Sequence, residues 1–178
     1  NGEHIYPKLN SNVSISGSTI KLLSSYLQES FDVEDYGEAI QKIDASEVLR
    51  DISIKGNVLR NSIIGGENNE TLIGGEGNDT LTGGDGSDIF LYSDGDGNDF
   101  ITDYSEEDTI QIASGKVSKV KTSGNNVILT VGKGNISVMG AAKKTITYID
   151  SDGEHTYPET VKFNSSGTAA TILSAYTK

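Results

Sequence analysis

Large apolar residues recur every nine positions through the middle of the chain. From residue 54 to residue 110 they keep one phase, and a two-residue interruption at Tyr92 and Ser93 shifts that phase once. The residues in phase are Ile54, Ile63, Leu72, Leu81, Phe90, Ile101 and Ile110. Self-similarity at a fixed period is typical of repeat architectures, so the pattern predicts a stack of short units.

Each unit reads as a turn followed by a very short strand. Two units are complete, GGEGNDTLT at 74–82 and GGDGSDIFL at 83–91, and less complete copies occupy 56–64, 65–73, 94–102 and 103–111. The first six positions predict a turn, because glycine permits positive φ and lets neighbouring backbones approach. The last three predict a strand whose central side chain points inward, with neighbours such as Thr80, Thr82 and Ile89 outward. Such a strand cannot bury its apolar side chain alone, so the units are expected to stack.

The direction of stacking follows from the same count. If one unit turns the chain halfway round, turns that lie directly over one another are 18 residues apart. We therefore expect the turn at 65–70 to lie over 83–88, and 56–61 over 74–79. The turn at 74–79 should lie over 94–99 despite the two inserted residues. The predicted fold class is all-β, a stack of short strands.

The charge of the chain is concentrated in these repeats. Against 14 Lys and Arg there are 26 Asp and Glu, a net charge of -12, and 13 of the 26 acids lie within 65–108. Between Arg60 and Lys116 there is no basic residue. Such density disfavours compaction, so either the segment is disordered or a counter-ion is part of its fold. The acidic balance also argues against nucleic acid as a partner. No apolar run reaches the roughly 18 residues that a membrane span needs.

The repeat brings oxygen atoms together between stacked turns. Backbone carbonyls of the second and fourth positions should converge with the side chain at the sixth. The resulting candidate metal ligands are Gly66, Asn68, Glu70, Gly75, Gly77, Asp79, Gly84, Gly86, Asp88, Gly95, Gly97 and Asp99. An all-oxygen anionic set favours calcium over zinc or copper, and over magnesium, which keeps its waters. We expect two or three ions, first at Asp79 with Asp99, then at Glu70 with Asp88, and last at Asp79 with Asn61.

Other readings of the acidic residues fail on spacing. DGDGND at 94–99 begins like an EF-hand loop, but the sixth position holds Asp99 and the twelfth Ser105, where glycine and glutamate are required. No serine-hydrolase elbow, zinc-protease motif or phosphate-loop lysine is present. The chain has no cysteine, which excludes disulfides and thiolate metal sites. We therefore predict no catalytic residues and no enzymatic activity for this chain.

The two complete units match the pattern G-G-x-G-x-D-x-U-x of the RTX (repeats-in-toxin, hemolysin-type) calcium-binding repeats, which this chain resembles. DGDGNDFITDYSEEDTI also resembles the segment that closes such arrays. The resemblance implies a parallel β-roll that folds on calcium, export by a type I secretion apparatus and a C-terminal export signal. The chain departs from the pattern at Asn68, Glu70 and Asp94, where the family has Gly, Asp and Gly.

The regions on either side of the repeats are expected to cap the two ends of the stack. We divide the chain into an N-terminal capping region (1–49), the calcium-binding β-roll (50–111), an antiparallel β cap (112–163) and a C-terminal tail (164–178). A bare end of a roll exposes apolar side chains and unpaired strand edges, which such caps would cover.

The N-terminal region permits two predictions. Ile20, Leu23, Leu27 and Phe31 have helical spacing, which favours a short helix, whereas Lys21-Leu22 and Ile40 to Ile43 could equally be strands.

The C-terminal region reads as strands joined by Gly and Asn turns. Its sequence predicts strands at 117–121, 126–131 and 135–139, followed by a hairpin that turns at Asp150 to Gly153. The tail reads equally as an export signal, as a frayed terminus or as a last strand docked on the cap.

These features predict a calcium-binding structural module that folds on calcium outside the cell and belongs to a larger exported protein. The chain begins with Asn1, which we interpret as a piece of a longer or processed polypeptide. The expected partners are calcium ions, the secretion apparatus and the rest of the parent chain, and the expected location is secreted or cell surface. The alternative is a carbohydrate- or surface-binding adhesin module, with a glycan stacked on Tyr92, Tyr104 and Tyr148.

Overall fold

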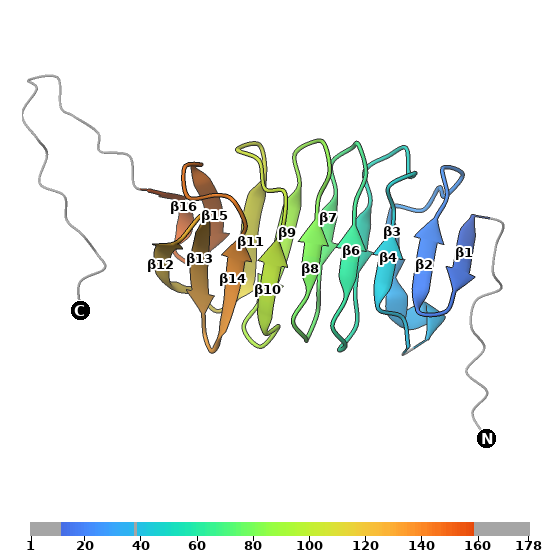
Figure 1. Cartoon of the computed structure of the whole chain (residues 1–178), viewed down its shortest axis with the longest axis horizontal. Coiled ribbons are helices and arrows are strands. Elements are labelled where there is room, and N and C mark those ends of the chain that lie inside the picture. Colours follow the sequence, from blue (N-terminus) through green and yellow to red (C-terminus); the bar gives the residue numbers. More distant parts are fainter. Residues whose placement is uncertain (1–11, 38, 159–178) are drawn as a thin grey trace, which may run out of the picture.

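A computed structural model describes residues 12–37 and 39–158 of the chain. The chain winds as a solenoid in which short strands alternate between two facing sheets, and turns join the sheets along both edges (Figure 1). Within the described residues, the one helical element is the short 3-10 helix η1 (Val33–Tyr36). The predicted fold class, an all-β parallel β-roll, is confirmed.

The first sheet has nine strands and the second has seven. In spatial order the nine-stranded sheet contains β1 (Val13–Ser16), β2 (Thr19–Leu22), β4 (Lys42–Asp44), β6 (Ser62–Ile64), β8 (Thr80–Thr82), β10 (Asn98–Ile101), β14 (Gly134–Val138), β13 (Asn126–Val131) and β12 (Val117–Ser123). The seven-stranded sheet contains β16 (Gly153–Tyr157), β15 (Ile146–Asp150), β11 (Thr109–Ser114), β9 (Ile89–Ser93), β7 (Thr71–Ile73), β5 (Ser53–Lys55) and β3 (Ser30–Asp32). Neighbours are parallel from β2 to β14 and from β3 to β15, and antiparallel pairs occur only at the ends of the described sheets.

The predicted inward residues form two ladders that face each other across the core. In the nine-stranded sheet Ile63 is in register with Leu81, which is in register with Ile101. In the seven-stranded sheet the ladder runs through Ile54, Leu72, Phe90 and Ile110. Each of the seven side chains is at most 2% exposed. The nine-residue period therefore predicted the core correctly, because one strand residue per unit points inward.

The two-residue insertion does not break the stack. Tyr92 and Ser93 lengthen β9, and because side chains alternate along a strand, Tyr92 points inward and is 3% exposed. Its hydroxyl donates to the carbonyl oxygen of Gly97 at 2.6 Å. Gly77 and Gly97 form an isolated parallel bridge. The turn at 74–79 thus lies over 94–99, as the sequence predicted.

The helix expected near the N-terminus is wrong, and the alternative prediction of strands is correct. Ile20 lies in β2 of one sheet and Phe31 in β3 of the other, and both point into the core. Leu27 lies in the connection between them and is 66% exposed. The four residues have helical spacing because two strands and their connection happen to place apolar residues four apart. Pairing of β2 with β4 and of β3 with β5 overrides any local helical preference.

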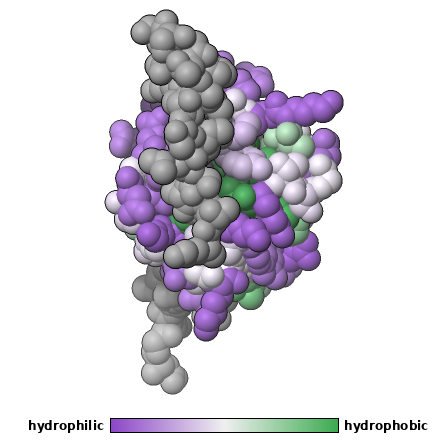
Figure 2. All heavy atoms as spheres, turned by 90° about the vertical axis from the view of Figure 1, so that its left-hand side faces the viewer, coloured by the Kyte–Doolittle hydropathy of each residue, from purple (hydrophilic) through white to green (hydrophobic). Residues whose placement is uncertain are grey.

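The C-terminal region continues both sheets. The strands predicted there are confirmed as β12, β13 and β14, and the hairpin as β15 and β16 with Asp150 opposite Gly153. β14 pairs in parallel with β10, and β15 with β11, so the cap extends the solenoid without a gap. From this end, hydrophobic residues show in the middle of the face and mostly hydrophilic residues around them (Figure 2).

The division of the chain into capping regions and roll stays a prediction, since the parallel ladders run through the expected boundaries near 50 and 112. The expected export signal at 164–178 lies outside the described residues. No helix in the described part of the chain is long and apolar enough to cross a membrane.

Two rows of turns follow the long sides of the solenoid. The upper edge in Figure 1 carries turns that leave the nine-stranded sheet, at 45–52, 65–70, 83–88 and 102–108, and the loop 139–145. The lower edge carries turns that leave the seven-stranded sheet, at 56–61, 74–79 and 94–97, and ends at the β13–β14 turn. The candidate ligands lie in these two rows.

Candidate calcium sites

The twelve predicted ligands separate into two groups of six. The turns at 65–70 and 83–88 place one group on the upper edge, namely Gly66, Asn68, Glu70, Gly84, Gly86 and Asp88. The turns at 74–79 and 94–99 place the other group on the lower edge, namely Gly75, Gly77, Asp79, Gly95, Gly97 and Asp99. Within each group, both turns stack directly on one another, whereas the β-roll core separates the two groups.

Side chains at the sixth position connect consecutive turns. On the lower edge, Asp79 Oδ1 accepts the amide N–H of Asn61 at 2.7 Å, and Asp99 Oδ1 accepts that of Asp79 at 2.9 Å. On the upper edge, Asp88 Oδ1 accepts the N–H of Glu70 at 2.8 Å. Each carboxylate therefore holds the preceding turn by one oxygen and is buried by the stack.

Three carboxylates at the sixth position have one oxygen without a partner. Glu70 Oε1, Asp79 Oδ2 and Asp88 Oδ2 are fully buried and make no hydrogen bond to any described residue. A buried carboxylate oxygen without a donor is costly, since it has lost its water and gained nothing in exchange. A hard divalent cation would satisfy such atoms, so the carboxylates present fit calcium.

Burial also shifts the acidity of these groups. It raises the pKa of Glu70 to about 7 and that of Asp79 to about 6. It likewise raises the pKa of Asp88 to about 6 and that of Asp99 to about 7. Hydrogen bonds from backbone amides oppose each shift, and neighbouring carboxylates add to it. Without a cation, these buried acids therefore take up protons at a higher pH than exposed acids do.

Backbone carbonyls at the second and fourth positions point along the stack. The Gly66 and Asn68 carbonyl oxygens would lie 2.0 and 1.9 Å from a Cβ atom built on Gly84 and Gly86. Gly84 and Gly86 also have φ of +107° and +112°, so only glycine fits this close approach. The Gly66 and Asn68 carbonyls thus point at the turn whose Asp88 carboxylate reaches back to the Glu70 amide.

Carboxylates alone do not make a metal site here. In the described ranges, no group of three or more His, Cys, Asp or Glu side chains could hold a metal ion. A bound cation would need backbone carbonyls beside one or two carboxylates, which is the ligand combination that the repeat predicts.

The carbonyl of Gly97 is the weakest of the predicted ligands. It accepts both the Tyr92 hydroxyl, at 2.6 Å, and the Asn135 amide, at 3.1 Å. A carbonyl oxygen has two lone pairs, and both are engaged. The Gly97 carbonyl therefore has no lone pair left for a cation.

Two acidic residues that the sequence analysis left out of the ligand set lie in a third gap of the upper edge. Asp103 accepts the amides of Gly83 and Gly84, at 3.0 and 2.9 Å, and Asp108 accepts that of Asp88 at 2.9 Å. Asp108 occupies the sixth position of the unit 103–111, so the period already pointed to it. Asp103 replaces the first glycine, a position that the repeat pattern does not assign to a ligand.

The aromatic residues expected to stack on a sugar are buried. Tyr92, Tyr104 and Tyr148 are 3%, 0% and 4% exposed. The Tyr104 hydroxyl donates to the Asp108 carbonyl and accepts the Thr147 amide, so it serves the fold. These three residues cannot form a sugar-binding surface, and that part of the adhesin prediction is wrong.

Three comparisons with known proteins give different results. A solved structure with a similar chain path is that of the extracellular lipase LipA from Serratia marcescens, at 19% sequence identity and a TM-score of 0.49. The alignment covers 74% of this chain and 22% of that chain, so this chain spans about a fifth of its length. No curated protein matches the chain. The family model of the RTX calcium-binding nonapeptide repeat matches residues 64–101, in four copies. Residues 64–101 of this chain are therefore RTX calcium-binding nonapeptide repeats.

Proposed function

We propose that this chain is a non-catalytic structural module whose repeats fold around two or three calcium ions outside the cell. The observation that carries the proposal is the set of three buried carboxylate oxygens without a donor, one each on Glu70, Asp79 and Asp88. They lie in stacked turns of a sequence that matches calcium-binding repeats. The proposed ligands are the twelve residues predicted from the repeat, together with Asp103 and Asp108.

Calcium would make folding of the module depend on whether the chain is inside or outside the cell, because the ion is scarce inside. Where the ion is scarce, the acidic turns repel one another and carry unsatisfied oxygens, which favours a loose chain. Extracellular calcium modules bind with Kd of roughly 0.1–1 mM. At ten times Kd, each ion adds about 1.4 kcal/mol, and three add about 4 kcal/mol, which is comparable with the stability of a small domain.

The proposal extends to the protein that contains this module. We place it in a larger polypeptide that leaves the cell by a type I route, because the RTX repeats resemble those of proteins exported in this way. Nothing in the described residues favours the alternative of glycan adhesion over this function.

A charge-matched pair of variants tests the calcium sites. The first is the triple variant Glu70→Gln, Asp79→Asn, Asp88→Asn, which removes the buried acids. The second is Glu67→Gln, Glu76→Gln, Asp85→Asn, which removes exposed acids from the third position of the same turns. Calcium titration is followed by isothermal calorimetry and by circular dichroism, with magnesium as the competing ion.

We expect the unmodified chain and the exposed-acid variant to bind two or three calcium ions and to gain β structure on binding. The buried-acid variant should lose both responses. Equal loss in the two variants would mean that only total charge matters. A chain that is fully folded in excess chelator and unchanged by calcium would refute the proposal.

A further inference from the structure

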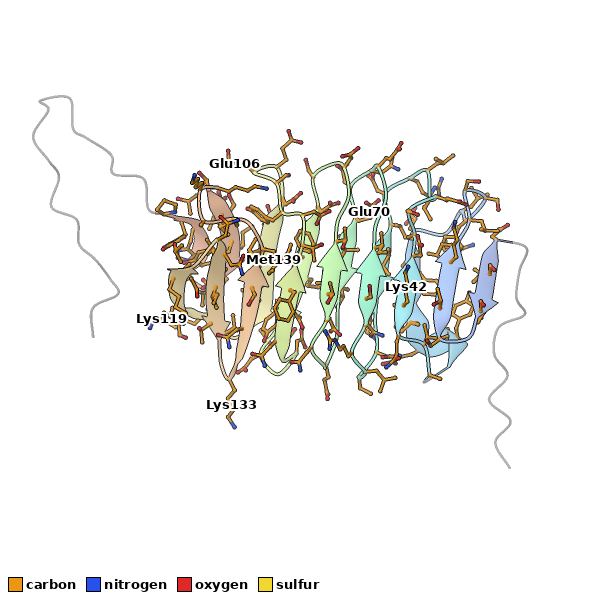
Figure 3. All side chains as sticks on the ribbon, in the orientation of Figure 1. Lys42, Glu70, Glu106, Lys119, Lys133 and Met139 are labelled. Carbon is orange, nitrogen blue, oxygen red and sulfur yellow. The ribbon has the colours of Figure 1, made fainter. Side chains whose placement is uncertain are left out.

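The last repeat turn of the upper edge is covered by the cap rather than by another repeat. Three groups of the cap contact the unit that begins at Asp103. The Thr145 amide donates to Glu106 Oε1 at 2.9 Å, and the Thr147 amide donates to the Tyr104 hydroxyl at 2.8 Å. The Lys144 ammonium donates to the Tyr104 carbonyl oxygen. Figure 3 shows Glu106 on this edge.

The position of the Tyr104 carbonyl gives the lysine contact its meaning. Tyr104 is the second residue of its unit, as Gly66 is of an earlier one. The Gly66 carbonyl points along the stack at the next turn, where it accepts the Asp85 N–H at 3.0 Å and borders the gap where a cation is proposed to bind. At the end of the row no further repeat turn follows, and the atom that meets the corresponding carbonyl is the nitrogen of Lys144.

An ammonium group can replace a metal ion at such an atom. It carries one positive charge and three donors, and carbonyl oxygens accept from it strongly. It is also part of the chain, so it is present at every calcium concentration. A lysine can therefore pair with a carbonyl oxygen at the end of a row of turns, where a soluble ion would otherwise have to bind.

We propose that Lys144 is a built-in cation that closes the upper row of turns in place of calcium. The gap between the turn at 103–108 and the loop 139–145 then binds no ion. The turn at 103–108 stays ordered on the cap when calcium is removed, while 65–70 and 83–88 become loose. The inference rests on the proposed function, because it assigns to lysine the role that calcium has in the other gaps.

The lower row ends differently and supplies a contrast. There the Gly97 carbonyl is met by neutral donors, the Tyr92 hydroxyl and the Asn135 amide. Lys133, in the turn that covers this end, points away from the molecule (Figure 3). A lysine near the end of a row is thus not sufficient, and the contact with a second-position carbonyl distinguishes Lys144.

Amide hydrogen exchange of the full chain tests the proposal in calcium-free buffer and in saturating calcium. The variants are Lys144→Met, which keeps the stem and removes the charge, Lys144→Arg, which keeps the charge, and Lys143→Met as the neighbouring control. In calcium-free buffer, we expect the amides of 103–108 to exchange about tenfold or more faster in Lys144→Met than in the unmodified chain. Lys144→Arg should restore slow exchange, and Lys143→Met should leave it unchanged.

The outcomes separate this inference from the proposed function. If 65–88 gains no protection from calcium, the proposed function fails, whatever happens at 103–108. If 103–108 of the unmodified chain needs calcium as much as 83–88 does, the lysine does not replace the ion. Normal exchange in Lys144→Met, or the same loss in Lys143→Met, would also overturn the inference.

Discussion

The turn at 56–61 and the acidic turns that follow it along the chain have the same place in the repeat but differ at the sixth position. Asn61 satisfies both ends of its amide, since Oδ1 accepts the Asn57 N–H at 2.8 Å and Nδ2 donates to the Ile40 carbonyl at 3.1 Å. Asp79 and Asp88 in the same position each keep one buried oxygen without a donor among the described residues. The hydrogen bonds of Asn61 are therefore satisfied within the protein, whereas those of Asp79 and Asp88 are not.

This difference between an amide and a carboxylate indicates which turns we expect to need an ion. An amide both donates and accepts, whereas an ionised carboxylate only accepts. Burying the carboxylate raises its pKa, as it does for Asp79, because the charged form has lost its water. We therefore expect the neutral turn to begin the stack without metal, and the stability of the acidic turns to depend on a cation.

Removal of calcium should produce the largest effect on this comparison. In chelator we expect amides in the acidic turns from 65 to 99 to exchange more than a hundredfold faster than in calcium. The amides of 56–61 should change by less than about tenfold. Hydrogen exchange of the unmodified chain measures both in one experiment. Equal loss in the two regions would show that the amide-based turn has no stability of its own.

Glycine substitution separates close approach from backbone strain. Gly84→Ala adds a Cβ 2.0 Å from the Gly66 carbonyl oxygen at a φ of +107°. Gly95→Ala has a similar φ of +110°, with no neighbouring atom within 4 Å. We expect a loss of about 3 kcal/mol or more for the first and about 1–2 kcal/mol for the second.

Urea unfolding in saturating calcium measures both losses. The turn at 56–61 holds Asn57 in the second position without positive φ, so a Cβ at this position is compatible with that turn. Equal losses for Gly84→Ala and Gly95→Ala would mean that the turns do not stack as closely as described.

Two substitutions, Asp79→Asn and Asn61→Asp, test the comparison between the sixth-position side chains directly. Asp79→Asn should stabilise the chain in calcium-free buffer, because it removes a buried charge. In calcium it should cost about 1.4 kcal/mol for each ion lost. Asn61→Asp should cost about 1–3 kcal/mol without calcium, since it breaks the bond to Ile40 and buries a charge. Thermal unfolding at two calcium concentrations gives both signs. An Asp79→Asn variant that is destabilised equally in both buffers would contradict the role assigned to the carboxylate.

The pH dependence should be the smallest effect, and it has a defined sign. Burial raises the pKa of the acids in the folded state, to about 6 for Asp88 and about 7 for Glu70. The stability that these protonated acids contribute to the metal-free chain is therefore fully present below about pH 4, and it is lost as pH rises through 6 to 7. In calcium-free buffer we expect Tm to rise by roughly 5 °C as the pH is lowered from 7.5 to 5.5.

The control for this pH dependence is the buried-acid triple variant with Asp99→Asn added, because burial also raises the pKa of Asp99 to about 7. This variant should show a much smaller change over the same range. In saturating calcium the sign should reverse for the unmodified chain, because protons compete with the ion for the same carboxylates. A Tm that is independent of pH in calcium-free buffer would contradict the raised pKa values.

The repeat region was predictable because its information is local and repeated. One inward residue and one sixth-position residue per unit, such as Leu81 and Asp79, could be read from the period alone. The N-terminal strands were less predictable, since Ile20 and Phe31 fit a helix as well as two strands. Asp103 was missed as a candidate ligand because it stands where the pattern has glycine.

The repeating unit, the residues that point into the core and the offset between stacked turns were predictable from the amino-acid pattern, because each unit repeats the same local preferences. The way the stack ends was not predictable, because it depends on long-range contacts. The pairing of β10 with β14, the burial of Tyr92 beside Gly97 and the contact of Lys144 with Tyr104 join residues up to 40 positions apart. Such contacts depend on which edges and carbonyls remain unpaired after the repeats have stacked. No local pattern records that outcome.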